Sequence, residues 1–241
     1  MDLKKQKILF LDRDGTICHD EGAFGSEKLP YSEVIKKIRV LSGVKESLKI
    51  AKDKGYMLVV ISNQAGIAKG RFDEWHTHYS NKMIQEKLDN IIDGFYYCPH
   101  HTSGRNNKGD ISENAKKYLI YKCDCRKPGI GMFLQCEEDL RNGKLQYIDE
   151  DILNNKIIYK EDRSAIYKKS VEPAVVDKDA SYMIGDKWLD VLAGYRYGVN
   201  PIFVLSGEGY VEFYKKKENQ KELPGRYDVF DDINVFIKEK L

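Results

Sequence analysis

Residues 7–16 read K-I-L-F-L-D-R-D-G-T, in which four apolar residues run directly into two aspartates. A short, unbroken apolar run is typical of a strand buried on both faces in the middle of a parallel sheet. Asp12 and Asp14 then follow the end of that strand, where open α/β sheets bind their ligands. A hairpin turn at Asp14-Gly15 is the alternative, but residues 16–21 do not continue as an alternating strand. The stretch therefore predicts a pair of functional carboxylates at one edge of a sheet.

The composition limits the class of protein. The 241 residues are 41% hydrophobic and 32% charged, which is enough apolar material for a core beneath a charged surface. A formal net charge of +2 gives no reason to expect a nucleic-acid or membrane partner, and we see no targeting segment or membrane span. The odd number of cysteines, five, favours metal or structural use in a reducing compartment, so a cytoplasmic protein is expected. Cys18 and Cys136 are expected to be small core residues.

Strands and helices are expected to alternate along the chain. After the first strand, further apolar runs predict strands at residues 56–61, 94–97, 182–184, 201–205 and 227–230. Helical patterns are expected at residues 43–54, 73–90, 131–141 and 188–197 and at the carboxyl end, and residues 34–40 could form a strand or a short helix. Such alternation predicts an α/β fold with a parallel sheet and right-handed crossovers.

Polar side chains follow the ends of the predicted strands. Asp12 and Asp14 follow the first strand, and Asp186 follows the fourth. Because the carboxyl ends of parallel strands share one edge of a sheet, we expect these side chains to lie close together. Carboxylates that meet at one place repel each other unless a cation lies among them, and Mg²⁺ prefers such oxygen ligands. The pattern therefore predicts a Mg²⁺ site at this edge.

The same residue types suit phosphoryl transfer. An aspartate at the end of a rigid strand can attack phosphorus as a nucleophile, and a second carboxylate nearby can protonate the leaving oxygen and later activate water. Ser62 and Asn63 follow the second strand and are expected to donate hydrogen bonds to phosphate oxygens, although Ser62 could instead cap a turn. Lys127 is expected to neutralise charge that develops in the transition state.

Several segments together carry a resemblance to a known family. They are, in chain order, L-F-L-D-R-D-G-T, S-N-Q-A-G-I-A-K-G, C-P-H-H, C-D-C-R-K-P-G and M-I-G-D-K-W-L-D. The chain resembles the haloacid-dehalogenase-superfamily phosphatases, and more narrowly the D-glycero-D-manno-heptose 1,7-bisphosphate 7-phosphatases and the related histidinol-phosphate phosphatases. The resemblance covers about residues 7–28, 43–136 and 176–205.

The resemblance implies a fold and an activity. The expected fold is a Rossmann-like, three-layer α/β structure with a central parallel sheet and no large cap domain. Residues 1–241 would form a single phosphatase domain, with a zinc-clamped loop at 98–125 and an extra insertion at about 142–175. The implied enzyme is a Mg²⁺-dependent phosphomonoesterase that acts through a phospho-aspartate on a small sugar phosphate. Heptose 1,7-bisphosphate, which would lose its 7-phosphate, is the first expectation.

Roles for individual residues also follow from the resemblance. Asp12 would be the nucleophile and Asp14 the general acid and base, and Mg²⁺ would be held by Asp12, the backbone carbonyl of Asp14 and Asp186. Asp190 would support the site, although Asp190 and Lys187 lie three residues apart on a predicted helix and could form an ordinary surface ion pair. The residues expected to contact phosphate or sugar are Arg13, Ser62, Asn63, Gln64, Arg126, Lys127 and Lys187.

A second metal site is predicted from the pattern C-x-H…C-x-C formed by Cys98, His100, Cys123 and Cys125. These ligand types suit a closed, tetrahedral Zn²⁺ site. Residues two apart do not share a helix face, so each pair must wrap the metal from an irregular loop; four unrelated loop residues are the alternative. We expect a structural Zn²⁺ that fixes the loop and aims the cations at residues 126 and 127 at the active site. The following proline is expected to hold residue 127 in an extended conformation.

Three questions remain open in the sequence. The interval at 101–122 between the zinc ligand pairs is long, which favours a sugar phosphate over histidinol phosphate as substrate. A zinc-loop protein that processes nucleic-acid ends or binds other proteins is the alternative of another class. It would need a basic stripe with aromatic platforms, for which only the Lys-rich segments 156–169 and 215–221 are candidates. The insertion at 142–175 is expected to leave the sheet away from the aspartates, where it could form a homo-oligomer contact and would not be a substrate lid.

Overall fold

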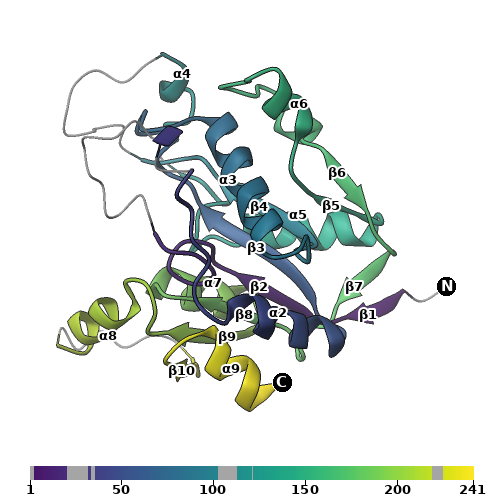
Figure 1. Cartoon of the computed structure of the whole chain (residues 1–241), viewed down its shortest axis with the longest axis vertical. Coiled ribbons are helices and arrows are strands. Elements are labelled where there is room, and N and C mark those ends of the chain that lie inside the picture. Colours follow the sequence, from purple (N-terminus) through teal and green to yellow (C-terminus); the bar gives the residue numbers. More distant parts are fainter. Residues whose placement is uncertain (1–2, 21–31, 34–35, 103–112, 121, 219–224) are drawn as a thin grey trace.

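Six parallel strands form the central sheet, in the order β10-β9-β8-β2-β3-β4 (Figure 1). The chain runs outward from β2 to β4, returns to β8 on the other side of β2, and runs outward again, so the strand order reverses between β2 and β8. This computed structural model describes residues 3–20, 32–33, 36–102, 113–120, 122–218 and 225–241. The six strands are β2 (Ile8–Leu11), β3 (Met57–Asn63), β4 (Gly94–Cys98), β8 (Tyr182–Gly185), β9 (Asn200–Val204) and β10 (Asp228–Phe230).

Helices cover both faces of the sheet, because the central strands are apolar on both sides. The side chains of Leu9 and Leu11 lie in one hydrophobic cluster with α2 (Val44–Asp53), α3 (Glu74–Lys87) and α9 (Ile233–Lys240). Those of Ile8 and Phe10 lie in a second cluster with α5 (Gly131–Arg141) and α7 (Trp188–Tyr197). All four of these β2 side chains are fully buried. The predicted three-layer α/β fold and the doubly buried first strand are confirmed.

Several short elements lie outside the predicted pattern. The strand β1 (Lys4–Gln6) pairs in parallel with β7 (Ala174–Val176), and β5 (Lys144–Gln146) pairs antiparallel with β6 (Lys168–Ser170). The remaining helical elements are α4 (Glu113–Lys116), α6 (Glu150–Asn154), the 3₁₀ helix η1 (Arg163–Ala165) and α8 (Gly209–Glu218). The expected strand or short helix at residues 34–40 falls partly outside the described residues. Among the helices that are described, none combines the length and apolarity needed to cross a bilayer.

The insertion at 142–175 runs along the outer side of α3 and β4 (Figure 1). It follows α5 and begins beside the amino-terminal end of β4, where Gly94 packs closely against β5. It then passes α3, where the indole of Trp75 donates to the carbonyl of Leu153 over 3.1 Å. Farther on, the guanidinium of Arg163 reaches the ring of Tyr97 at the carboxyl end of β4, 4.7 Å from its centroid. The insertion therefore begins far from the aspartates. It then returns toward the loop at 98–125 that carries Cys98, His100, Cys123 and Cys125, which we call the Cys/His loop.

Candidate active site

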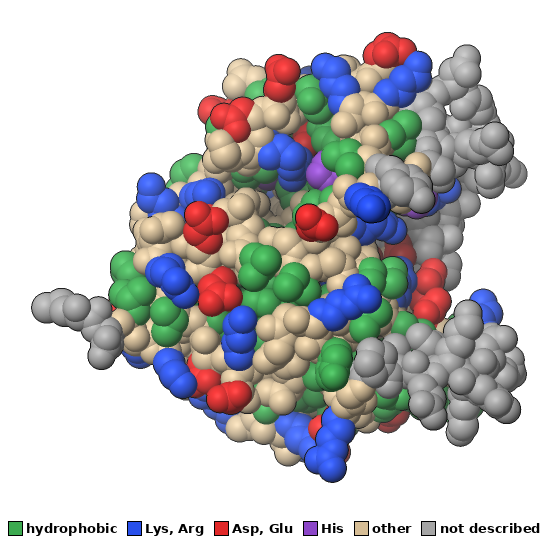
Figure 2. Space-filling view, turned by 180° about the vertical axis from the view of Figure 1, so that it is seen from behind, with side chains coloured by type: hydrophobic (Ala, Val, Ile, Leu, Met, Phe, Trp, Pro, Cys, Tyr) green, Lys and Arg blue, Asp and Glu red, His purple; other side chains and the backbone are tan. Residues whose placement is uncertain are grey.

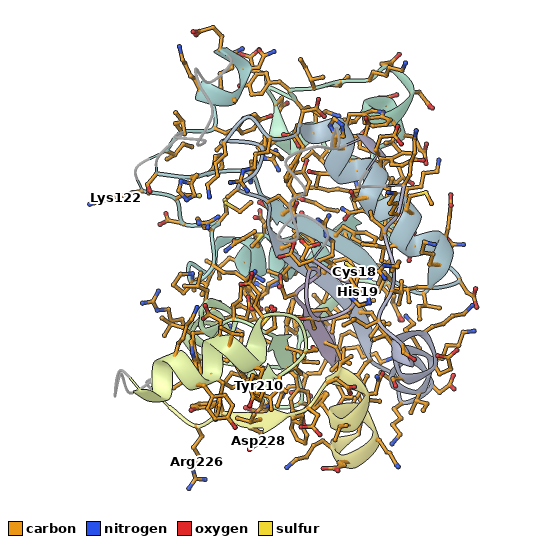
Figure 3. The ribbon with its side chains drawn as sticks, turned by 60° about the vertical axis from the view of Figure 1, so that its left-hand side comes forward. Cys18, His19, Lys122, Tyr210, Arg226 and Asp228 are labelled. Atoms are coloured by element: carbon orange, nitrogen blue, oxygen red, sulfur yellow. The ribbon has the colours of Figure 1, made fainter. Side chains whose placement is uncertain are left out.

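A cavity of about 440 Å³ lies at the carboxyl ends of β2, β3 and β8. This is the place where the strand order reverses, which is where open α/β sheets bind ligands. Figure 3 views the molecule with this side turned forward, and Cys18 and His19, which line the cavity, mark the segment that follows β2. None of the described residues of the insertion lines the cavity. Its walls include Asp12, Arg13, Asp14, Ser62, Asn63, Gln64, Lys127, Lys187 and Asp190.

Lys127 connects two buried carboxylates at the centre of the site. Its Nζ lies 2.6 Å from Asp12 Oδ1 and 2.6 Å from Asp190 Oδ1, and it donates to the carbonyl of Ile61 over 2.7 Å. Burial alone would lower the pKa of Lys127, but Asp12 and Asp190 outweigh it and raise the pKa above its ordinary value. The lysine is therefore a fixed positive charge beside Asp12. The alternative of a surface pair between Asp190 and Lys187 is wrong, because the Asp190 side chain is buried and bonds to Lys127.

Asp186 offers a carboxylate oxygen that nothing in the described structure satisfies. Its Oδ2 accepts from the backbone N–H of Glu208 over 2.8 Å, while its buried Oδ1 has no partner. Burial and the neighbouring Asp12 and Asp190 raise the pKa of Asp186 to about 8. Ligand atoms of these three aspartates lie within 4.8 Å of one another. A cation among them would relieve both their mutual repulsion and the unsatisfied oxygen.

Gly15 explains how the loop after β2 approaches Asp186 so closely. Its φ of 89° lies in the left-handed region that side chains with a Cβ rarely adopt. A Cβ at this position would lie only 2.2 Å from Asp186 Oδ2. The glycine of the D-x-D-G motif is therefore required both for the turn and for the contact between the ends of β2 and β8.

Asp14 is held by side chains from two elements. Arg13 donates to it from Nε over 3.1 Å and from Nη2 over 2.9 Å, and Gln64 Nε2 donates over 2.9 Å. Burial raises the pKa of Asp14, but the charge and hydrogen bonds of Arg13 and the hydrogen bond from Gln64 lower it overall. Arg13 also donates to Asn81 Oδ1 on α3 over 3.1 Å. These contacts place Arg13 between the second aspartate and α3.

The two polar residues that end β3 occupy different surroundings. Ser62 Oγ accepts from Gln64 Nε2 over 2.7 Å, which leaves its own hydrogen to be donated toward the cavity. Asn63 instead clamps the backbone of Lys127: its Nδ2 donates to the Lys127 carbonyl over 3.1 Å, and its Oδ1 accepts from the Lys127 N–H over 2.9 Å. The side chain of Asn63 therefore positions Lys127, whereas the sequence suggested a direct phosphate contact.

Further charged residues line the cavity mouth. Lys187 is flanked by Asp20 and Glu208, each with a carboxylate oxygen 3.7 Å from its Nζ, and their charges with those of Asp186 and Asp12 raise its pKa despite burial. Lys69 and Arg71 also line the cavity. Burial, Arg71 and Arg126 lower the pKa of Lys69, so these cations repel one another.

Sequence reasoning gave no role to Lys69, Arg71, Asp20 or Glu208. A count of the cations within and directly after the S-N-Q-A-G-I-A-K-G segment could have drawn attention to Lys69 and Arg71, because that segment follows the second predicted strand directly. Arg126, which was expected to contact substrate, is not among the residues that line the cavity. Its Nη1 lies 3.5 Å from the carbonyl of His100.

The predicted Cys/His ligands converge on one point next to β4. His100 Nδ1 lies 3.1 Å from Cys123 Sγ and 3.2 Å from Cys125 Sγ, and Cys98 Sγ lies 3.6 Å from the same nitrogen. The four ligand atoms all lie within 4.8 Å of one another. Such spacings fit four ligands around one ion with bonds of about 2.0–2.3 Å. The hydrogen bond with Cys125 lowers the pKa of Cys98 to about 5, which favours a thiolate.

The loop that carries these ligands leads directly to the aspartates. Cys125 precedes Arg126 and Lys127 in the chain, and Lys127 is joined to Pro128 by a cis peptide bond. Residues 103–112 and 121 of this loop lie outside the described residues. The cluster can hold a metal ion, and its position next to Lys127 connects it to Asp12.

Comparison with known proteins relates the chain to phosphatases. The model of a family described as Polynucleotide kinase 3 phosphatase matches residues 7–184. The chain is 33% identical over 217 residues to the D-glycero-beta-D-manno-heptose-1,7-bisphosphate 7-phosphatase of Haemophilus ducreyi, a match that covers 88% of this chain and 90% of the relative. It is 32% identical over 209 residues to the protein of the same name from Escherichia coli O6:H1, covering 85% of this chain and 83% of the relative.

Solved structures show the same fold. The D,D-heptose 1.7-bisphosphate phosphatase from B. bronchiseptica, solved in complex with magnesium and phosphate, matches with a TM-score of 0.59 at 18% identity and covers 97% of each chain. A had-like phosphatase from Mesorhizobium loti matches with a TM-score of 0.59 at 21% identity, covering 98% of this chain and 88% of that one. The predicted haloacid-dehalogenase-like fold is confirmed.

Proposed function

The chain belongs to the family of the D-glycero-beta-D-manno-heptose-1,7-bisphosphate 7-phosphatases, and we propose that it removes the 7-phosphate from heptose 1,7-bisphosphate. It is a phosphatase that hydrolyses phosphate monoesters. The observation that carries the proposal is the position of Lys127 Nζ, 2.6 Å from Asp12 Oδ1, beside the buried and unpaired Oδ1 of Asp186. This arrangement combines a nucleophile, a fixed positive charge and an open ligand position at the strand-order reversal.

Asp12 would act as the nucleophile. One of its carboxylate oxygens forms a bond to phosphorus while the bond between phosphorus and the sugar oxygen breaks, which gives a phospho-aspartate. Lys127 lies where it can stabilise the negative charge that develops on the phosphoryl oxygens. Ser62 can donate its hydroxyl hydrogen to one of those oxygens. Water then attacks phosphorus, inorganic phosphate leaves, and the Asp12 carboxylate is restored.

Asp14 would move protons in both halves of the reaction. It gives a proton to the leaving sugar oxygen and later takes one from the attacking water. The pairing with Arg13 lowers the pKa of Asp14 and so keeps it ionised, which is the state from which it can take a proton in the second step. A phosphate dianion bound beside it would raise the pKa again, because a nearby negative charge disfavours a second one. Substrate binding therefore favours the protonated form that the first step needs.

Magnesium fits the residues at this edge. Asp190 uses one oxygen for Lys127 and the other for the backbone N–H of Lys187, so the ligands left for a cation are Asp12 and Asp186. The backbone carbonyl of Asp14 would complete the protein ligands. Bound Mg²⁺ would supply charge neutralisation for the phosphate oxygens. The structurally similar phosphatase from B. bronchiseptica was solved with magnesium and phosphate, which supports this assignment.

Zinc would occupy the Cys98, His100, Cys123 and Cys125 cluster as a structural ion. Three thiols and one imidazole leave no ligand position for water in a tetrahedral site. The ion would thus fix the course of the loop toward Lys127 and take no part in the chemistry. None of the five cysteines forms a disulfide, which is consistent with a reducing compartment. We therefore propose that the protein is cytoplasmic.

The second phosphate of the substrate would bind near Lys69 and Arg71. These cations line the mouth of the cavity, and repulsion among them and Arg126 contributes to lowering the pKa of Lys69. An anionic ligand would relieve that repulsion, so a bisphosphate is better matched than a monophosphate. On the face shown in Figure 2, basic and acidic side chains are interspersed. The described residues of that face therefore do not form the basic stripe that nucleic acid requires.

A phosphate-release screen tests the proposal. The purified protein with Mg²⁺ is given heptose 1,7-bisphosphate, histidinol phosphate, a sugar monophosphate and a DNA oligonucleotide with a 3′-phosphate. We expect the highest kcat/KM for the heptose bisphosphate, and a Lys69→Gln, Arg71→Gln variant that loses this preference while still cleaving p-nitrophenyl phosphate. A higher kcat/KM for histidinol phosphate or for the 3′-phosphorylated oligonucleotide would refute the proposed substrate.

A further inference from the structure

A buried carboxylate outside the active site joins three parts of the chain. Glu74 opens α3, and its side chain is fully buried. Its Oε1 accepts from Arg163 Nη1 over 2.5 Å and from the hydroxyl of Tyr118 over 2.8 Å. Its Oε2 accepts from the hydroxyl of Tyr97. Arg163 belongs to the insertion, Tyr118 to the Cys/His loop, and Tyr97 directly precedes the ligand Cys98.

The network continues from Tyr97 into the start of the insertion. Burial lowers the pKa of His78 to about 3, so this side chain is neutral. Its Nδ1 accepts from the backbone N–H of Asp149 over 3.0 Å, which places the proton on Nε2. That nitrogen lies 3.0 Å from the Tyr97 oxygen and donates to it, while the tyrosine hydrogen goes to Glu74. Two separate points of the insertion thus reach one carboxylate.

The loop side of the network lies against the metal ligands. The ring centroids of Tyr118 and His100 are 6.2 Å apart, and the backbone N–H of His101 donates to the Tyr118 carbonyl over 3.3 Å. Tyr159 of the insertion packs edge-on against Tyr118 at 5.1 Å. The insertion therefore touches the Cys/His loop through both apolar and charged contacts. The chain that leaves this loop reaches Lys127 two residues after Cys125.

We propose that Glu74 is a positioning residue that fastens the insertion to the Cys/His loop and thereby keeps Lys127 on Asp12. A buried carboxylate that loses its cation costs free energy, so Glu74 favours the arrangement in which Arg163 of the insertion stays beside it. Because Tyr118 of the Cys/His loop donates to the same carboxylate, this arrangement also holds the loop against the insertion. The insertion acts on the active site without entering its cavity. This extends the proposed function, because it rests on Lys127 being part of the catalytic machinery.

Two variants in the insertion provide a matched test. Arg163 and Lys168 both line a second cavity of about 370 Å³, and both pair with a buried carboxylate. Their side chains are 27% and 25% exposed, respectively. Arg163 reaches Glu74 in the network, whereas Lys168 reaches Asp139 on α5, 2.8 Å away. Arg163→Met and Lys168→Met thus remove similar charges, and only the first removes a tie to the Cys/His loop.

We expect Arg163→Met to lower kcat by about 10- to 100-fold for both heptose bisphosphate and p-nitrophenyl phosphate. KM should change little, because the variant disturbs the position of Lys127 and not the binding of substrate. Lys168→Met should stay within about twofold of the parent protein. Hydrogen exchange measured on the metal-loaded proteins should show faster amide exchange across 113–127 in Arg163→Met alone. Arg163→Lys, which keeps the charge, should recover part of both losses.

Equal kcat and equal loop protection in the two methionine variants would overturn the proposal, and so would a rise in KM with kcat unchanged. If Arg163→Met does not fold, Tyr118→Phe decides the question, because it removes one hydroxyl from Glu74 and keeps the ring. Unchanged exchange at 113–127 in that variant would also overturn the proposal. Since p-nitrophenyl phosphate and hydrogen exchange do not depend on the sugar, failure of the proposed substrate would be seen separately.

Discussion

The unpaired oxygen of Asp186 predicts a stability that depends on both pH and magnesium. Burial and two neighbouring carboxylates raise the pKa of Asp186 to about 8, against 3.8 for an ordinary aspartate. Between these values the folded protein holds a proton that the unfolded chain has released, so stability falls as pH rises and levels off above pH 8. Burial and the neighbouring Asp12 raise the pKa of Asp190 to about 6, against the opposing charge and hydrogen bond of Lys127. The interval from pH 6 to pH 8 therefore reports mainly on Asp186.

The size of the effect follows from that interval. With a folded pKa of about 8, titration of one carboxylate between pH 6 and pH 8 costs about 2 kcal/mol of unfolding free energy. In a protein of this size that corresponds to a decrease of about 4–8 °C in Tm. Asp186→Asn has no proton to lose, so it should lack this component. Saturating Mg²⁺ should remove it from the parent protein as well, because a bound cation keeps the carboxylate ionised at both pH values.

Urea unfolding at pH 6 and pH 8 provides the assay. The parent protein and Asp186→Asn are dialysed into Mg²⁺-free buffer, without a chelator that could strip the Cys/His cluster, and each is measured with and without added Mg²⁺. Subtracting the variant from the parent removes the contribution of histidines that titrate in the same interval. If the parent protein and Asp186→Asn lost the same unfolding free energy between pH 6 and pH 8 without Mg²⁺, the reasoning would be refuted. Asp186 would then not titrate in that interval.

Three further outcomes are expected. Asp12→Asn should stay folded and lose roughly 10⁴-fold or more in phosphate release, because an amide cannot form an acyl phosphate; substantial turnover in pure variant protein would contradict the nucleophile assignment. Gly15→Ala should lose about 1–3 kcal/mol in urea unfolding, since φ is 89° and its Cβ would meet Asp186 Oδ2 at 2.2 Å; parent-like stability would argue against that packing. Elemental analysis should find about one zinc per chain, and its removal should speed exchange at 113–127 and reduce turnover even with fresh Mg²⁺; zinc-free protein with full activity would exclude the structural role.

The central sheet could be predicted because its strands are buried on both faces. Runs such as residues 8–11 and 56–61 are apolar throughout, and the structure places strands within one or two residues of those limits. The short strands β1 and β6 were missed for the opposite reason. The sequence of β1 is K-K-Q and that of β6 is K-K-S, which carry no apolar alternation. They form because a partner backbone lies beside them, and that information is not local.

The helix α8 was missed because its sequence resembles a solvated segment. It carries a run of lysines at its end, which the Lys-rich pattern at 215–221 suggested was a loop or an exposed helix face. Its inner side is nevertheless aromatic: the ring of Phe213 stacks at 6.0 Å on Trp188, which itself stacks at 4.4 Å on Phe203 of β9. The contact partners come from elements that are distant in sequence.

Motif order located the site residues but not their mutual contacts. Asp12, Asp186 and Lys127 were predicted at one sheet edge because each follows a strand or the Cys/His loop. The position of Asp190 was ambiguous, since a spacing of three residues on a helix is equally suited to a surface ion pair. Only the packing of α7 against the sheet shows that its carboxylate is buried and turned toward Lys127.

The charges at the sheet edge give a physical reason to expect that a divalent cation binds before the chemistry begins. Asp12, Asp186 and Asp190 carry three negative charges when ionised, and Lys127 supplies one positive charge at bonding distance. The charge of Lys187 is shared with Asp20 and Glu208, each 3.7 Å from its Nζ, so the cluster keeps an excess of negative charge. A phosphate dianion approaching Asp12 would be repelled by that excess. One divalent ion would balance that excess, so we expect Mg²⁺ to let phosphate reach Asp12 as well as to stabilise the transition state. The same excess underlies the expected pH dependence without Mg²⁺. Below pH 8 a proton on Asp186 removes one negative charge from the cluster, and Mg²⁺ would compete with that proton for the same carboxylate.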